Sequence, residues 1–170
     1  VVGTFTVSLT ASGADGSGPV VAVDGTSPTF TVTRSMPGSF VALTPSRLLD
    51  TRSGTGVATA GAIGANGVVN VQVTGHGAVP TTGVGAVILN VTAVTPARQG
   101  YLTVFPTGGA APTASNVNFT VGQVVPNLVV AKVGTGGKVS IQNASLGATH
   151  MVADVAGYFL DGIVTDPGGL

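Results

Sequence analysis

Alternation of apolar and polar residues with a period of two is the feature that most limits how this chain can fold. The segment "TFTVSLT" puts Phe5, Val7 and Leu9 on one side, and the same pattern returns in "PTFTVTR", "VVNVQVTG", "GYLTVFP" and "THMVADVAGYF". Successive side chains of a strand point to opposite faces, whereas the apolar spacing of a helix hardly occurs here. The sequence therefore predicts about nine or ten short strands, rich in Val and Thr, separated by turns.

Many short strands without a convincing helix favour one architecture. We expect an all-β fold, an antiparallel β-sandwich of jelly-roll or immunoglobulin-like type. The run "VGAVILNVTAV" is typical of a central strand covered on both faces. We also predict a hairpin in which "GTGG" joins "NLVVAKV" to "KVSIQN". The alternation in "SNVNFTV" predicts that Val117, Phe119 and Val121 share the buried face.

The 170 residues suffice for one domain plus a fragment of another. Residues 1–36 hold two candidate strands around the loop "ASGADGSGP", and two strands alone are marginally stable in water. We expect this pair to be the tail of a preceding immunoglobulin-like domain or an added edge of the main sheet. We expect residues 37–162 to form the main sandwich and residues 163–170 to be a flexible tail. Since the chain begins at Val1 without a signal peptide, we expect a piece of a longer protein.

The composition argues against several classes of function. Charged residues make up only 7% of the chain, and six basic residues balance six acidic ones. No basic patch is available to neutralise many phosphates, so we expect no nucleic-acid partner. The longest apolar runs are too short to span a bilayer, so we expect no membrane insertion. The absence of cysteine excludes disulfides, thiol catalysis and thiolate metal sites.

Catalytic and metal-binding patterns are poorly supported. Only His76 and His150 could act as a general base. His150 and Asp154 share a face of one predicted strand, but about 3.3 Å per residue separates them by roughly 13 Å. His76 lies between glycines, which is typical of a solvated turn. We therefore expect no enzyme and no cofactor; a calcium ion at Asp15 or Asp24 is the only weak alternative.

The stretch "SRLLDTRSGTG" gathers three formal charges, Arg47, Asp50 and Arg52, in a chain that otherwise avoids charge. Asp154, in the last long strand, shares a side with Val152 and Ala156 and would be costly to leave unpaired there. Our hypothesis is that Arg47 or Arg52 pairs with Asp154 and pins the first strand of the module to the last. The rival interpretation makes the Arg-Asp-Arg group a pocket for an acidic ligand.

A second candidate site is a row of polar side chains. Asn116, Asn118 and Thr120 alternate with the apolar residues of "SNVNFTV" and should share the opposite face. Because the chain lacks tryptophan and has only two tyrosines, a sugar site would depend on hydrogen bonds such as these. The row is thus a candidate ligand surface, a contact between subunits, or a solvated strand face.

Four sequence motifs suggest a relationship to a known protein family. "ALTPSRLLDTRSGTG", "AVILNVTAVTPARQGYLTVFPTG", "SNVNFTVGQVVPNLVVAKVGTGGKVSIQN" and "THMVADVAGYF" follow one another over about residues 41–160. Together they resemble an accessory β-module of secreted and surface proteins of actinomycete-type bacteria, which accompanies hydrolases, peptidases and immunoglobulin-like arrays or occurs in tandem. The first 34 residues resemble the end of a bacterial immunoglobulin-like domain. The resemblance implies an extracellular or cell-surface location and carries no catalytic residues.

These observations lead to one expected function and two alternatives. We expect a non-catalytic structural or adhesive β-module of a larger secreted or surface-assembled protein, in contact with neighbouring domains or copies of itself. The first alternative is a carbohydrate-binding accessory module of a secreted hydrolase, with cell-surface polysaccharide as its partner. The second is a structural subunit of a virion or appendage.

Overall fold

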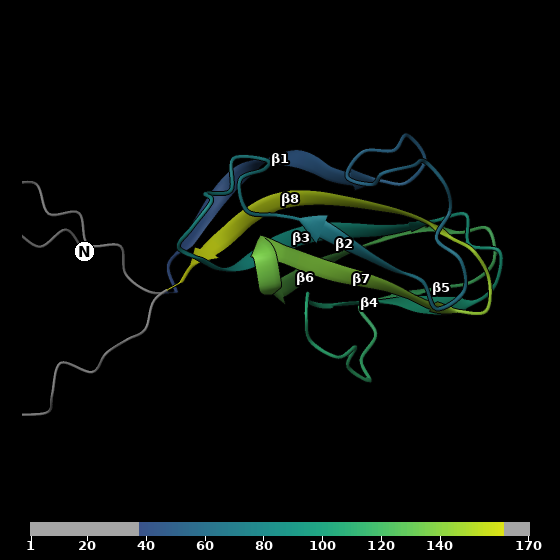
Figure 1. Cartoon of the computed structure of the whole chain (residues 1–170). Coiled ribbons are helices and arrows are strands. Elements are labelled where there is room, and N and C mark those ends of the chain that lie inside the picture. Colours follow the sequence, from purple (N-terminus) through teal and green to yellow (C-terminus); the bar gives the residue numbers. More distant parts are fainter. Residues whose placement is uncertain (1–37, 162–170) are drawn as a thin grey trace, which may run out of the picture. The chain divides into compact units, whose positions relative to one another are not determined.

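The computed structural model describes residues 38–161, which form eight strands in two antiparallel sheets (Figure 1). The only helical element of this range is a single 3-10 turn, Thr135–Gly137. The strands are β1 (Phe40–Asp50), β2 (Val68–Gln72), β3 (Val84–Val94), β4 (Gly100–Pro106), β5 (Val117–Phe119), β6 (Val124–Lys132), β7 (Lys138–Ser145) and β8 (His150–Leu160). The all-β sandwich expected from the alternation is confirmed.

The strand order is that of a jelly roll. One sheet has the order β1-β8-β3-β6 and the other β2-β7-β4-β5. Within the sheets β1 pairs with β8, β2 with β7, β3 with β6 and β4 with β5, so the chain behaves as one long hairpin rolled into two layers. An immunoglobulin sheet pairs strands that are close in sequence, such as its first two. The immunoglobulin-like alternative is therefore wrong for these residues.

The core lies between the sheets and is built by the inward half of each alternating strand. Valine dominates it, and its largest fully buried side chains are Leu49, Leu89, Leu102, Ile141 and Met151. Strand β3 lies between β8 and β6, as its continuous apolar run predicted. Its residues nevertheless alternate between buried and half-buried positions. The outer face of this central strand is therefore only partly covered.

The predicted hairpin around "GTGG" is wrong. Strand β6 lies in one sheet and β7 in the other, so residues 134–137 carry the chain across the sandwich. This connection passes close to the end of β4. Position 134 therefore needs a glycine, because a Cβ on Gly134 would collide with the backbone of Thr107. A glycine-rich turn between two apolar runs has the same sequence signal whether the runs pair or separate.

The predicted face of "SNVNFTV" is correct for Val117 and Phe119, which are buried, and wrong for Val121, which is 62% exposed. Strand β5 ends at Phe119, and the chain then turns through Gly122 with a positive φ of 74°. The turn breaks the alternation before it reaches Val121, because the period of two holds only while the backbone stays extended.

Several expectations lie outside the described residues. These are the strand pair within 1–36, the tail 163–170 and the calcium alternative at Asp15 or Asp24. The strands of the sandwich run from Phe40 to Leu160. Within residues 38–161, no helix is long and apolar enough to cross a membrane.

The position of Leu89 at the centre of the core gives a test of the fold. Leu89 is fully buried, so Leu89→Ala should lower the free energy of unfolding by about 3 kcal/mol through lost burial and a residual cavity. The matched control is Leu146→Ala, because Leu146 is 84% exposed and should change stability by less than about 0.5 kcal/mol. Urea unfolding followed by circular dichroism measures both, and equal effects would contradict this placement of the core.

Candidate functional site

Arg47 joins the first strand of the sandwich to the last. It lies opposite Asp154 in the register of β1 and β8. Its Nε donates to Asp154 Oδ1 at 2.7 Å, and a terminal nitrogen donates to Asp154 Oδ2 at 3.1 Å. This two-pronged geometry is the strongest form of an arginine–carboxylate pair. Of the two arginines considered in the sequence, it is Arg47 that meets Asp154.

Asp50 occupies the centre of the cluster. Its side chain is only 8% exposed. Arg52 donates to both of its carboxylate oxygens, at 2.9 Å and 2.7 Å, and Arg47 adds a third side-chain bond at 3.1 Å. The backbone N–H of Arg52 also donates to Asp50 Oδ1 at 3.0 Å. Strand β1 ends at Asp50, and the turn that follows brings Arg52 back to Asp50.

These contacts shift the ionisation of the cluster. The hydrogen bonds from the Arg52 guanidinium hold the pKa of Asp50 well below its usual range, although burial acts in the opposite direction. The pKa values of Arg52 and Arg47 are raised by their bonds to Asp50 and Asp154 respectively. Asp50 and both arginines are therefore charged at neutral pH.

The cluster has the geometry of a staple. Two arginines and two aspartates carry no net formal charge, and both guanidinium groups are already bound to carboxylates. An acidic ligand would have to displace Asp50 or Asp154 before it could form a two-pronged pair with either guanidinium group. The arrangement thus gives little support to an acidic-ligand pocket and more to an ion pair that fixes strands.

The polar row is not a uniform surface. The side-chain oxygen of Asn116 accepts the backbone N–H of Val104 at 2.7 Å, and its backbone carbonyl accepts Asn127 Nδ2 at 2.6 Å. Asn116 therefore holds the loop before β5 against β4. Asn118 is exposed and lies opposite Tyr101 of β4, and exposed Thr120 lies past the end of β5. Only Asn118 and Thr120 remain available to a ligand or a subunit.

The two histidines have separate surroundings. His150 Nδ1 lies 3.0 Å from the hydroxyl oxygen of Thr51, which also accepts the backbone N–H of Met151 at 3.0 Å. Asp154, the acid considered for His150, is bound to Arg47 instead. His76 is exposed in the turn after β2, as expected. Within residues 38–161, no three metal-ligating side chains gather at one point.

A feature that the sequence analysis missed is an apolar row across the outer face of the sheet β1-β8-β3-β6. A Cβ on Gly157 would collide with the Phe40 ring, which shows that this ring lies on the Gly157 backbone. Gly157 lies opposite Ile88 on β3, and Ile88 lies opposite Val130 on β6. We call Phe40, Ile88, Leu128, Val130 and Phe159 the apolar face.

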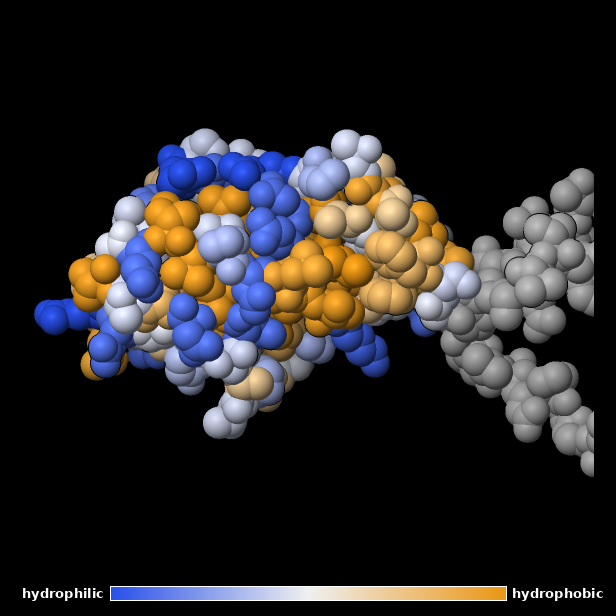
Figure 2. Space-filling view, turned by 180° about the vertical axis from the view of Figure 1, so that it is seen from behind, coloured by the Kyte–Doolittle hydropathy of each residue, from blue (hydrophilic) through white to orange (hydrophobic). Residues whose placement is uncertain are grey.

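The apolar face is open in this structure. Leu128, Val130 and Phe40 are 63%, 62% and 50% exposed. The Phe40 and Phe159 rings pack with centroids 5.4 Å apart. Figure 2 views the molecule from the side opposite to that of Figure 1 and shows hydrophobic surface gathered there. Alternation alone could have placed these side chains outward, but only the tertiary structure shows that Phe40, Ile88 and Val130 line up across the sheet, with Leu128 and Phe159 in the neighbouring rows.

Asp50 provides a test of the staple. Asp50→Asn should lower the free energy of unfolding at pH 7 by about 2 kcal/mol, because charge-assisted bonds from two arginines to a buried carboxylate are weakened. Asp161→Asn is the control, since Asp161 is exposed beyond the end of β8. Urea unfolding compares the two, and an unchanged Asp50→Asn protein would contradict a structural role.

The same carboxylate predicts how stability depends on pH. Because folding lowers the pKa of Asp50 from 3.8, its contribution is complete above about pH 5 and is lost as the pH falls through the folded pKa. The free energy of unfolding should therefore decrease from about pH 5 to pH 2, and less steeply in Asp50→Asn. Denaturant titrations across this range measure the difference, and parallel curves for the two proteins would refute the assignment.

Comparison with known proteins adds no assignment to this geometry. No protein-family model matches the chain, and neither a curated protein nor a solved structure shows significant similarity to it. The resemblance to an accessory module of secreted bacterial proteins therefore remains a prediction.

Proposed function

We propose that this chain is a non-catalytic structural β-module that assembles with further copies of itself through its apolar face. The single observation that carries the proposal is the row formed by Phe40, Ile88 and Val130, which crosses four strands and is open to solvent. Contiguous exposed apolar patches on soluble proteins are typical of interaction sites.

A second copy is the partner that fits this face best. Next to the apolar face, Arg47 and Asp154 neutralise each other. Among the paired residues of β3 and β6, only Lys132, at the end of β6, carries a formal charge. Two such faces can meet without strong repulsion between like charges, which is what a two-fold symmetric interface requires. The core of such an interface is usually apolar and poor in charge.

The alternatives share part of this interpretation. A virion or appendage subunit would use the same apolar face, in a larger closed or helical assembly. Carbohydrate binding at the polar row has less support, because Asn116 is committed to β4 and only Asn118 and Thr120 are available there. The self-association proposal is therefore preferred to sugar binding at that row.

The extracellular or cell-surface location is part of the proposal. It is supported by the resemblance of residues 41–160 to a module of secreted proteins. A surface with few charges also suits a domain that is tethered in a longer chain or packed against its neighbours.

Self-association can be tested with the full 170-residue chain. Light scattering during size-exclusion chromatography and analytical ultracentrifugation, from micromolar to near-millimolar concentration, should show dimers or larger assemblies that increase with concentration. The double variant Leu128→Asp, Val130→Asp should remain monomeric, because burial of two carboxylates in an apolar interface is unfavourable.

Leu146→Asp is the matched control. Leu146 is equally apolar and 84% exposed, but it lies in the turn after β7 and not on the apolar face. This variant should assemble like the unmodified chain. Circular dichroism confirms that each variant is folded. A chain that stays monomeric at every concentration, or a Leu146→Asp variant that dissociates like the double variant, would contradict the proposal.

A further inference from the structure

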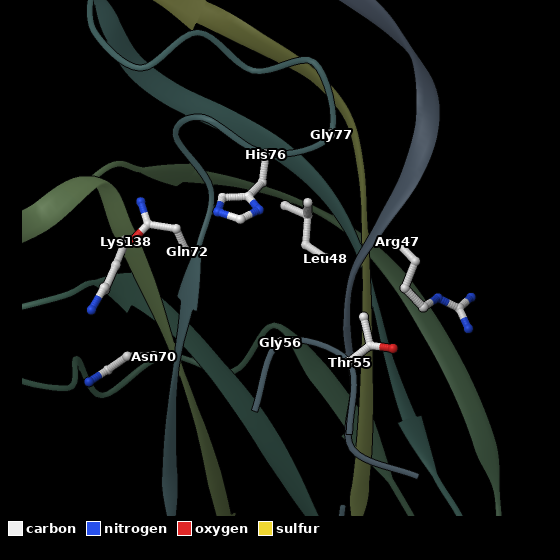
Figure 3. Close-up of a pocket in the computed structure, with 9 residues that line it drawn as sticks. All are labelled: Arg47, Leu48, Thr55, Gly56, Asn70, Gln72, His76, Gly77 and Lys138. Atoms are coloured by element: carbon white, nitrogen blue, oxygen red, sulfur yellow. The ribbon is translucent and has the colours of Figure 1, made fainter. Parts of the chain in front are cut away.

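A hollow of about 420 Å³ is lined by residues of β1 and β2, which are edge strands of the two sheets, and of nearby loops (Figure 3). This volume is within the range of small-molecule pockets. Figure 3 shows His76 and Leu48 side by side at one end and Gly56 at the other. Gln72, Lys138 and Asn70 stand on the β2 side, whereas Arg47 is directed away toward its aspartate partners.

Two loops close the ends of the hollow, and glycine is required in each. Gly77, with a φ of 56°, packs so tightly on β1 that a Cβ would lie 3.0 Å from Leu48 Cδ2 and 2.7 Å from Val155 Cγ1. A Cβ on Gly56 would collide with the carbonyl oxygen of Leu48. The hollow therefore has a fixed loop at each end, and we expect it to suit a compact molecule better than an extended peptide.

The free edge of β2 lines one side with backbone polar groups. The Asn143 N–H donates to the Gly67 carbonyl, and the Val73 N–H donates to the Gly137 carbonyl. In an antiparallel pair of strands, these two bonds mean that the N–H and C=O groups of the odd-numbered residues of β2 point toward β7. Those of Asn70 and Gln72 consequently point to the unpaired edge, where they offer alternating donors and acceptors to a ligand.

The side chains around the hollow are cationic or neutral. No aspartate is among its lining residues. Lys138 forms no ion pair with any acid in the described range, where five basic and three acidic residues leave a formal net charge of +2. The turn before Lys138 is held in place, because the Gly137 carbonyl accepts bonds from Val73 N–H, Thr74 N–H and Gln72 Nε2, each at 3.1 Å. Lys138 thus follows a fixed turn and lines the hollow without an ion-pair partner in the described range.

We propose that this hollow binds one carboxylate-bearing sugar residue, a hexuronate. The sugar hydroxyls would bond to the free backbone edge of β2 at Asn70 and Gln72 and to the imidazole of His76. A C–H face of the ring would rest on Leu48, and the carboxylate would pair with Lys138.

The mixed lining distinguishes this ligand from simpler anions. A small inorganic anion would use Lys138 and the backbone N–H groups but leave the outward backbone carbonyls of β2 without partners. A neutral sugar would use the backbone edge but not the ammonium group. A ligand with hydroxyls, an apolar face and one negative charge matches the backbone edge of β2, the small exposed part of Leu48 and Lys138 together. The site is separate from the apolar face, so it stands or fails independently of self-association.

Nuclear magnetic resonance titration of the isotope-labelled full chain tests this site. Galacturonate and glucuronate are the probes, with galactose, glucose and acetate as comparisons. At least one uronate should shift the amide signals of Gly56, Asn70, Gln72 and His76. It should bind about tenfold more tightly than the matched neutral sugar and than acetate, because only the uronate makes both the charged and the neutral contacts.

Lys138→Gln should weaken uronate binding about tenfold and leave the neutral sugar unchanged. Lys132→Gln is the matched control, because Lys132 is exposed on β6 of the other sheet and should bind uronate normally. The proposal is overturned if neither uronate shifts these amides, if acetate or the neutral sugar binds as tightly as the uronate, or if Lys132→Gln has the effect of Lys138→Gln.

Discussion

The pairing of β1 with β8 closes the sandwich, and every other strand pair lies inside it. Arg47 and Asp154 are 107 residues apart in the chain, yet their side chains meet at 2.7 Å. Because β2–β7, β3–β6 and β4–β5 are nested within this pair, the ends of the module can meet correctly only when the intervening strands are in place. The ion pair also opposes a register slip, since a shift by one residue would turn Asp154 toward the core.

The same register gives the two outer faces of the sandwich different characters. On the sheet β1-β8-β3-β6, glycine at position 157 lets the Phe40 ring lie flat and extend an apolar row to Val130. On the other sheet, Asn70 and Gln72 of β2 and Lys138 of β7 are polar, and the β2 edge is unpaired. The proposed assembly and the proposed ligand binding would therefore use opposite outer regions of the sandwich, with only β1 contributing residues to both.

Residue alternation predicted much of the fold, but the sequence predicted the candidate sites only in part. Strand β4 begins and ends where "GYLTVFP" predicted, and the central place of β3 followed from its apolar run. Sequence charge also led to Arg47, Asp50, Arg52 and Asp154. Sequence reasoning failed at the 134–137 crossing, at Val121 and at Asn116, because each depends on which backbone the chain meets in space. The hollow had no signal at all, since its walls come from loops and edges distant in sequence.

The sequence by itself determined that this chain forms strands, which side chains face inward, and that its few charges must find partners. These are local properties, because the period of two and the cost of an unpaired charge act on each segment wherever it lies. Only the tertiary structure decided which strands are neighbours, which arginine holds Asp154, and which side chains line up as an apolar row or surround a hollow. Those outcomes depend on register and on the crossing of the chain between sheets, and contacts between residues far apart in sequence set both.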